Sequence, residues 1–265
     1  MTASASQQRD LPAAAGAAKA DDVWRRAELI SDLHLDGAHP ATVAAFLSYL
    51  ARCDADALFI LGDLFEVWVG DDAVAPGDVA DRCADGLASL AARGCALHFM
   101  AGNRDFLLGD GYAARCRMTR LPDPWTLDFA GRRWLLSHGD AWCLADADYQ
   151  HWRHQVRNPA WMSQFLSRPL PQRQDFARHA RAESHRQQAQ RDTWADIDAP
   201  TARAALHATG ATTLIHGHTH RPGWSTLGEG FDRWVLGDWD AQATPPRAAG
   251  LRVDADGSVA LIDLC

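Results

Sequence analysis

Short apolar runs recur along the chain, and side chains that commonly bind metals follow nearly every one of them. Five runs have the length of a buried strand: residues 28–31, 57–61, 95–101, 134–137 and 213–215. The residues that follow them are Asp32-Leu33-His34, Gly62-Asp63, Gly102-Asn103-Arg104-Asp105, His138-Gly139-Asp140 and His216-Gly217-His218-Thr219-His220. If the five strands are parallel neighbours in one sheet, these side chains converge at its carboxyl edge, where open α/β folds keep their sites. The pattern therefore predicts a metal-dependent enzyme.

Helical periodicity separates the strand-like runs. Pro40 can open a helix, because the apolar residues after it fall on one stripe, and a second helix is predicted over residues 78–93. Further strands are predicted at 234–237, 250–253 and 259–264. Alternating strands and helices are typical of a layered α/β fold, here with two sheets faced by helices.

The length of 265 residues and the hydrophobic content of 47% allow one sizeable core. We expect one catalytic domain over residues 23–265, with an insertion at about 142–200. Residues 1–22 are rich in Ala, Ser and Gln and do not resemble a secretory signal, so a disordered extension is predicted there. Because the sequence holds no apolar run long enough to span a bilayer, any membrane contact should be peripheral.

The six cysteines show no paired C-x-x-C spacing, and several lie in apolar segments where a reduced thiol packs as a small hydrophobe. A reducing cytoplasm is the expected compartment.

Charge is distributed unevenly. The net charge is −8, yet residues 151–191 hold eight arginines against two acidic residues. Such a basic stretch on an acidic protein indicates a place for a phosphorylated ligand or an anionic membrane surface. It is also compatible with a solvated helical face in a chain whose only lysine is Lys19.

The candidate ligands combine carboxylate, imidazole and amide oxygen, which suits Mn²⁺, Fe²⁺ or Zn²⁺, while the absence of Cys argues against a structural zinc site. Seven ligands are too many for one catalytic ion with an open position, and they suit two ions bridged by a carboxylate. Two ions about 3.5 to 4 Å apart can activate a water for in-line phosphoryl displacement. Each motif alone is weak, since a lone buried His is more often a hydrogen-bonded core residue, but five in this order are specific. The seven are Asp32, His34, Asp63, Asn103, His138, His218 and His220.

The series D-x-H, G-D, G-N, H and G-H-x-H resembles the calcineurin-like binuclear metallophosphoesterases. The resemblance implies a fold of two packed mixed sheets flanked by helices. It also implies that Asp32, His34 and His220 bind one ion, that Asn103, His138 and His218 bind the other, and that Asp63 bridges them. His216 lies outside the pattern and is expected to support a ligand.

Longer blocks narrow the resemblance. Residues 31–35, 61–72, 102–109 and 216–222 are similar to the UDP-2,3-diacylglucosamine pyrophosphatase family of lipid A synthesis, and the similarity extends from about residue 27 to 264. It implies hydrolysis of the pyrophosphate to UMP and 2,3-diacylglucosamine 1-phosphate (lipid X), with two Mn²⁺ ions per chain or with Fe²⁺ or another divalent ion. It further implies peripheral association with the cytoplasmic side of the inner membrane.

Arg104 follows a metal ligand and can fork onto phosphate oxygens, with attack expected on the α-phosphorus. The resemblance implies that Asp146 and Ser184 contact the substrate. Gln188 and Arg191 stand where relatives carry Asn and Lys. Asn103 and His218 are expected to contact the substrate as well. The predicted catalytic residues are Asp32, His34, Asp63, Asn103, Arg104 and His138.

The insertion carries apolar residues interspersed among its arginines, which would let a helical lid bury acyl chains beside phosphate or headgroups. Alternatively, these side chains pack the insertion on the catalytic core. They are Trp152, Trp161, Met162, Phe165, Leu166, Leu170 and Phe176.

Two other functions share this sequence pattern. A binuclear phosphoesterase acting on a soluble nucleotide or phosphoprotein would have the same ligands, and the aromatic, Arg-rich insertion argues against it. A non-catalytic scaffold is disfavoured because all seven ligands are present. The protein is expected to be a monomer and to have no nucleic-acid partner.

Overall fold

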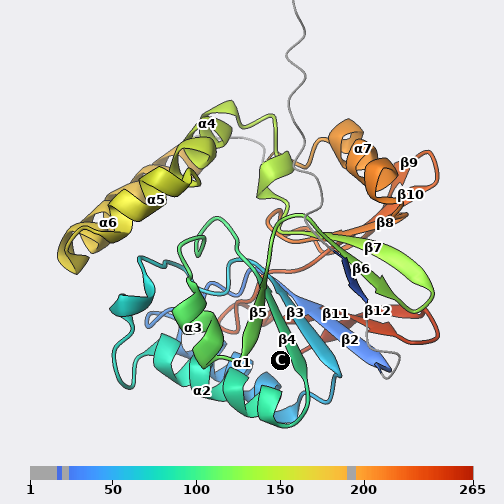
Figure 1. The fold of residues 1–265 in the computed structure, drawn as a ribbon, viewed down its shortest axis with the longest axis horizontal. Helices are drawn as coiled ribbons and strands as arrows, with labels where there is room; N and C mark the ends of the chain where they lie inside the picture. The colour runs from blue at the N-terminus through green and yellow to red at the C-terminus, as the bar shows by residue number, and fades with distance from the viewer. Residues whose placement is uncertain (1–16, 20–23, 190–194, 265) are drawn as a thin grey trace, which may run out of the picture.

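The computed structural model describes residues 17–19, 24–189 and 195–264, and in this part of the chain two six-stranded mixed sheets pack against each other (Figure 1). The first sheet has the order β12-β11-β2-β3-β4-β5. Its strands are β2 (Arg26–Ile30), β3 (Ala57–Leu61), β4 (Ala96–Met100), β5 (Met118–Leu121), β11 (Ala249–Asp254) and β12 (Val259–Asp263).

The second sheet has the order β1-β6-β7-β8-β10-β9. Its strands are β1 (Ala17–Lys19), β6 (Trp125–Phe129), β7 (Arg132–Ser137), β8 (Thr213–His216), β9 (Gly223–Gly228) and β10 (Phe231–Val235). Strands β7, β8 and β10 are parallel to one another, as are β2, β3, β4 and β5 in the first sheet.

Strand β3 shows why the central strands are apolar throughout. Phe59 and Leu61 face the core between the two sheets, whereas Leu58 and Ile60 face the helices on the other side. Because both faces of the strand are covered, every residue of β3 is buried. The apolar run therefore lacks the alternation of a half-exposed strand.

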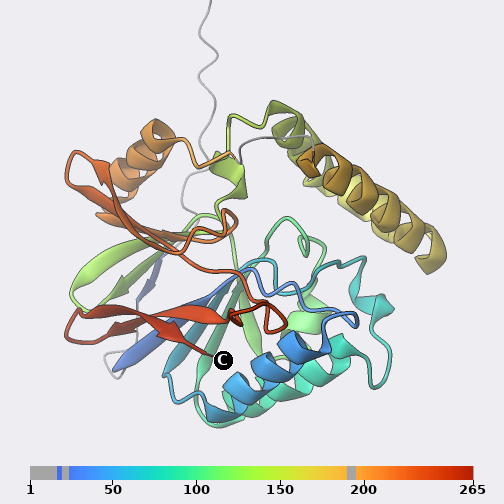
Figure 2. The same cartoon turned by 180° about the vertical axis from the view of Figure 1, so that it is seen from behind.

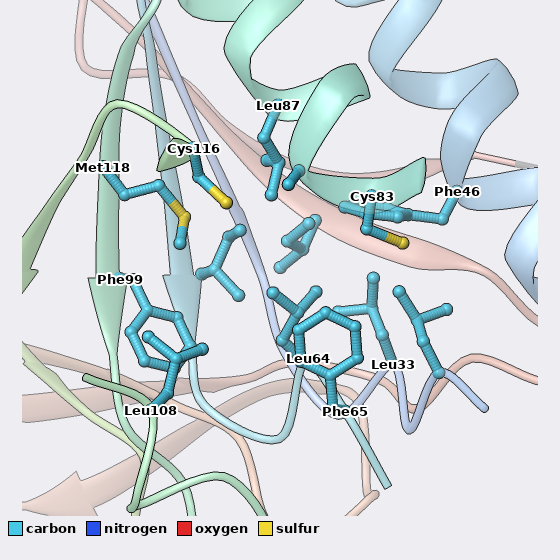
Figure 3. Close-up of a cluster of buried hydrophobic side chains, with 14 of the residues drawn as sticks. Leu33, Phe46, Leu64, Phe65, Cys83, Leu87, Phe99, Leu108, Cys116 and Met118 are labelled. Carbon is cyan, nitrogen blue, oxygen red and sulfur yellow. The ribbon is translucent and has the colours of Figure 1, made fainter. Parts of the chain in front are cut away.

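Helices α1 (Pro40–Arg52), α2 (Val79–Ala92) and α3 (Asp110–Arg115) cover the outer face of the first sheet (Figure 2). Figure 3 shows their apolar contacts, with Phe46, Cys83 and Leu87 close to Leu64 and Leu33. Helix α7 (Ala199–Thr209) packs on the second sheet. The predicted helix at 78–93 is confirmed, with Asp78 as its N-cap, accepting from the Asp81 amide at 2.7 Å.

The predicted insertion contains helices α4 (Ala147–Val156), α5 (Pro159–Leu166) and α6 (Leu170–Ala189), which lie together to one side of the sheets (Figure 1). The buried Arg173 of α6 attaches this group to the core. Its guanidinium donates to the Val69 carbonyl at 2.5 Å and to Asp72 Oδ1 at 2.8 Å.

The five strand-like runs are confirmed as β2, β3, β4, β7 and β8, and so is the predicted fold of two mixed sheets flanked by helices, although the five strands do not all lie in one sheet. Strands β2, β3 and β4 belong to the first sheet, and β7 and β8 to the second. Apolar periodicity identifies buried strands but contains no information about which strands pair, because pairing depends on contacts distant in sequence.

Residues 17–19 also differ from expectation. The disordered extension was predicted over 1–22, yet Ala17–Lys19 form β1, parallel to β6. An edge strand offers unpaired backbone groups that any sequence can meet, so composition alone missed this pairing. The remainder of the predicted extension lies outside the described residues.

Cys53, Cys83, Cys95, Cys116 and Cys143 are free thiols, while Cys265 lies outside the described residues. Among the described helices, none is long and apolar enough to cross a membrane.

Candidate metal centre and substrate cavity

All seven predicted ligands lie just beyond the carboxyl ends of strands, and the two sheets bring those ends together. The first sheet supplies Asp32 and His34 after β2, Asp63 after β3 and Asn103 after β4; the second supplies His138 after β7 and His218 and His220 after β8. The junction is close, since the Asp32 amide donates to Gly62 O at 3.1 Å and the His218 amide donates to Asp32 Oδ2 at 2.8 Å.

One group of ligand atoms comes from Asp32, His34 and His220, which all lie within 4.8 Å of one another. His220 Nε2 is 3.2 Å from Asp32 Oδ1 and 3.4 Å from His34 Nε2. Asp63 Oδ2 lies 4.0 Å from His34 Nε2. Donors that bind one ion at about 2.1 Å are separated by about 3 Å, so these side chains fit a divalent cation.

A second group surrounds His138. Asp32, Asp63 and His138 also place ligand atoms within 4.8 Å of one another, with His138 Nε2 3.7 Å from Asp63 Oδ1. Asn103 Oδ1 is 3.0 Å from His138 Nε2 and 2.9 Å from His218 Nδ1. Asp32 belongs to both groups, and Asp63 lies close to both, with Oδ2 4.0 Å from His34 Nε2.

The backbone at the centre is unusual. Asp32, His34, Asp63, His218 and His220 all have positive φ, between 49° and 66°. Non-glycine residues rarely adopt this left-handed conformation, which costs about 1 kcal/mol or more per residue. The surrounding packing holds the ligands in this conformation. Each side chain therefore points toward the junction between the sheets.

Glycines next to the ligands allow the close approach of the strand ends. A Cβ at Gly62 would lie 2.5 Å from His138 Nδ1, and one at Gly102 would lie 2.1 Å from Asp63 Oδ1. The glycines of the G-D and G-N motifs are therefore required by space rather than by turn geometry alone.

Neighbouring groups orient the ligands. His138 Nδ1 lies 2.8 Å from Leu61 O, and because a carbonyl only accepts, Nδ1 carries the proton and Nε2 faces the cluster. The Arg104 amide donates to Asp63 Oδ1 at 2.8 Å. His216 Nδ1 lies 2.9 Å from Gly217 O, in keeping with a supporting role.

The charges of the centre are strongly coupled. Burial disfavours the charged form of His138, but the carboxylates of Asp63, Asp32 and Asp140 outweigh it and raise the pKa of His138 to about 9. Burial also opposes ionisation of Asp32, yet the hydrogen bond from His220 and the nearby histidines hold the pKa of Asp32 well below its usual value. A buried carboxylate that remains ionised, as Asp32 does, attracts cations.

A cavity of about 580 Å³ opens beside the ligands. His34, Asp63, Asn103, His218 and His220 line one part of it, and aromatic side chains of the insertion line another. These aromatics are Trp152, Trp161, Phe165 and Phe176. The metal centre and the insertion therefore share one space.

The sequence pattern of the calcineurin-like phosphoesterases matches residues 29–222, from the start of the first ligand motif to the end of the last. The chain belongs to this family. Two relatives are both 46% identical over 241 residues and are named UDP-2,3-diacylglucosamine hydrolase. In both cases the aligned region covers 86% of this chain. It covers 95% of the protein from Xanthomonas campestris pv. campestris and 94% of that from Stenotrophomonas maltophilia (strain K279a). The predicted resemblance is confirmed.

Several predicted substrate residues of this phosphoesterase lie at the cavity. Arg104, Asp146 and Ser184 all line it, and Asp146 also caps α4 by accepting from the Tyr149 amide at 3.1 Å. Gln188 belongs to α6, but its side chain lies outside the described part of the structure, as does the whole of Arg191. Substrate contact by these residues stays a prediction.

The aromatic side chains of the insertion pack on the core and also line the cavity. The Phe106 ring of the core lies 6.2 Å from Trp152 and 6.4 Å from Trp161, so the aromatics pack the insertion on the phosphoesterase core. Trp161 and Phe165 stack at 4.9 Å while also lining the cavity. Phe165 is 2% exposed and Phe176 is 36% exposed. Phe176 is thus the one more open to a ligand.

Sequence reasoning missed two buried carboxylates that support the ligands. Asp105 accepts hydrogen bonds from the amides of Gly102 at 2.8 Å and Leu64 at 2.7 Å, and burial together with Asp63 raises the pKa of Asp105 to about 6. Asp123 accepts from the His138 amide at 3.3 Å. Asp105 stands inside the G-N-R-D block, which is a usable signal, whereas Asp123 precedes Pro124 in no recognisable motif.

Proposed function

We propose that this phosphoesterase hydrolyses the pyrophosphate bond of UDP-2,3-diacylglucosamine, giving UMP and 2,3-diacylglucosamine 1-phosphate (lipid X). The observation that carries the proposal is the single cavity that joins the ligand cluster to the aromatic insertion. A polar end suits the pyrophosphate, and an apolar end suits acyl chains. The names of the relatives support the same substrate.

We infer that the site binds two divalent ions. Mn²⁺ is the expected metal, and Fe²⁺ is the alternative. Asp32, His34 and His220 would hold one, Asn103, His138 and His218 the other, and Asp63 both. When bound, such a pair supplies the positive charge that favours ionisation of water and stabilises negative charge on a phosphoryl group. The chain's own residues bind and position the substrate.

Arg104 lines the cavity directly after Asn103. We infer that its guanidinium binds the pyrophosphate oxygens and holds the α-phosphorus for in-line attack, so that the lipid-sugar phosphate leaves. Asn103 and His218 face the same space and are inferred to contact the phosphate. Asp146 and Ser184, at the insertion side, are inferred to contact the sugar nucleotide and lipid, together with Gln188 and Arg191.

The insertion is inferred to hold the acyl chains. Its aromatics line the cavity while α4 and α6 also carry arginines, a combination that suits a lipid with a phosphate headgroup. Because such a substrate resides in a bilayer, we infer that the enzyme works as a monomer attached peripherally to the cytoplasmic side of the inner membrane.

The test is UMP release from metal-stripped protein given UDP-2,3-diacylglucosamine, with Mn²⁺ added back and UDP-N-acetylglucosamine as the unacylated control. Turnover that requires Mn²⁺ and acyl chains supports the proposal. Hydrolysis of soluble nucleotides or simple phosphodiesters, without turnover of the diacyl substrate, would keep the phosphoesterase centre and reject the substrate.

The position of attack is tested in water enriched in ¹⁸O. Attack on the α-phosphorus places the label in UMP, as proposed. Label in lipid X would instead show attack on the phosphorus next to the sugar and would refute this part of the proposal.

A further inference from the structure

Asp140 is a fully buried carboxylate two residues beyond the ligand His138, and the insertion neutralises it. Three side chains around α4 reach its Oδ2 atom: the Tyr149 hydroxyl donates to it at 2.5 Å, Arg153 Nε donates at 2.8 Å, and the Arg157 guanidinium lies at 3.5 Å. The two arginines thus form ion pairs with this buried carboxylate. The insertion is therefore joined to the loop after β7 by a buried ionic contact.

Arg157 makes a second contact. Among the described hydrogen bonds, Arg153 has no such contact. Its guanidinium donates to the carbonyl of Gly102 at 2.7 Å, and its Cζ lies 5.3 Å from the centre of the Phe106 ring. Gly102 immediately precedes the ligand Asn103. One side chain of the insertion thus links the backbone beside Asn103 to the carboxylate beside His138.

The Gly102 segment has little freedom once this contact is made. The Gly102 amide donates to Asp105 Oδ1 at 2.8 Å, and its carbonyl accepts from Arg157. The Asn103 side chain that follows lies 3.0 Å from His138 Nε2 and 2.9 Å from His218 Nδ1. The ring of Tyr149, also from α4, stacks on His218 at 6.1 Å. All three ligands of one ion group are therefore near contacts with the insertion.

The other group is supported differently. His34 lies 2.9 Å from Glu66, and His220 lies 3.2 Å from Asp32, on residues that follow β2, β3 and β8. The insertion reaches this group through Arg181 of α6, which donates to Glu66, so the contacts of Arg157 concern only the group of Asn103, His138 and His218.

We propose that Arg157 is a positioning residue for the ion held by Asn103, His138 and His218, so that the insertion completes the metal centre as well as lining the cavity. The proposal rests on the two-ion centre of the proposed function. Groups that support metal ligands typically change metal affinity by about 10- to 100-fold when removed. We expect such a loss for one of two ions only.

The experiment uses the full chain, stripped of metal, and Mn²⁺ alone as the probe. Calorimetry gives the two affinities, and electron paramagnetic resonance distinguishes a coupled Mn²⁺ pair from an isolated ion. Arg157→Gln should weaken one affinity about 10- to 100-fold and shift the spectrum at limiting Mn²⁺ toward the isolated ion. Arg178→Gln removes an equal charge from the exposed face of α6, where Arg178 pairs with Asp175, and should leave both affinities unchanged.

Two further variants keep the outcome decisive. Arg153→Gln removes a partner of Asp140 but leaves the Gly102 contact, so its loss in affinity should be smaller than that of Arg157→Gln. Arg157→Lys keeps the positive charge but lacks the planar guanidinium group. Its affinity for the affected ion should lie between those of the wild-type protein and Arg157→Gln. Unchanged affinities in a folded Arg157→Gln or Arg157→Lys protein would overturn the proposal, as would equal losses in the Arg153 and Arg157 variants.

Metal binding is measured here without substrate, so the result separates from the proposed function. A wild-type protein that binds two Mn²⁺ ions but does not release UMP would reject the substrate and leave the role of Arg157 intact. Full wild-type turnover with unaltered Mn²⁺ binding in Arg157→Gln would reject only the role of Arg157.

Discussion

Glu66 Oε2 lies 2.9 Å from Nδ1 of His34, so the carboxylate holds the imidazole from the side opposite to the metal-facing Nε2. A carboxylate behind a ligating histidine fixes which nitrogen carries the proton and increases the basicity of the other. Arg181 of α6 also donates to Glu66, which connects the insertion to the first ion group. Glu66 thus stands beside His34 and joins it to α6.

Glu66→Gln should lower the affinity for the ion bound by Asp32, His34 and His220 by about 10-fold, because the amide is a weaker acceptor for His34. Titration of metal-stripped protein with Mn²⁺ measures the change. Glu66→Ala should have the larger effect, since no acceptor remains. Equal affinities in wild-type and both variants would show that Glu66 does not orient His34.

Gly62→Ala should abolish activity, because its Cβ would lie 2.5 Å from His138 Nδ1 and the residue has φ of +90°. The displaced imidazole would lose its bond to Leu61 O and its direction toward Asn103. We expect kcat/KM to fall by about 100-fold or more. Gly37→Ala is the matched control, since nothing lies within 4 Å of its Cβ and its backbone is unstrained. Activity of Gly62→Ala equal to that of the control would contradict the geometry.

Phe176→Ser should raise KM for the diacylated substrate, because this cavity-lining ring is 36% exposed and offers apolar surface to an acyl chain. Removing it should weaken binding by about 1 to 2 kcal/mol, or roughly 5- to 30-fold in KM, with kcat little changed. Steady-state kinetics on UDP-2,3-diacylglucosamine checks this. The fold should persist because Phe176 is less buried than Phe165. A KM that stays the same would place the acyl chains elsewhere.

His98 gives a prediction for pH. Its ring stacks on Phe59 at 4.6 Å between the two sheets, and burial lowers the pKa of His98 to about 4. The unfolded chain then binds more protons than the folded chain between pH 6.5 and 4, so His98 lowers stability as pH falls through this window.

His98→Phe should flatten the dependence of unfolding free energy on pH in that range, by at most about 3 kcal/mol. Urea unfolding of metal-stripped protein at pH 7, 5.5 and 4.5 measures it, and the exposed His207 provides the control substitution. The prediction fails if the difference between variant and wild-type is the same at all three pH values.

The local features of the chain were predictable. The strand at residues 57–61 and the helix predicted over residues 78–93 follow from apolar runs and helical periodicity, and the structure confirms both. The seven predicted ligands could be named from the sequence because each lies within a few residues of the end of a strand, where its own segment places the side chain. The identity of the metal-binding groups is therefore a property of local sequence.

Other contacts had no local signal. The division of the five strands between the two sheets could not be predicted, because β4 and β7 are both buried strands whose partners cannot be read from periodicity. Asp123 is close to His138 through a backbone contact that no motif marks. The left-handed conformations of Asp32 and Asp63 likewise exist only because the two sheets meet there.

The sequence by itself determined the chemistry of this protein, since the order and type of its strand-end residues specify a metal-dependent phosphoesterase. Only the tertiary structure decided that two sheets share the centre, that the cavity runs from the ligands to the aromatic insertion, and that Arg157 joins that insertion to Gly102. The physical reason is the separation along the chain of the residues that interact. Ligand type and strand position are set within a few residues, whereas contacts such as that of Arg157 with Gly102, 55 residues apart, arise from packing of the whole fold.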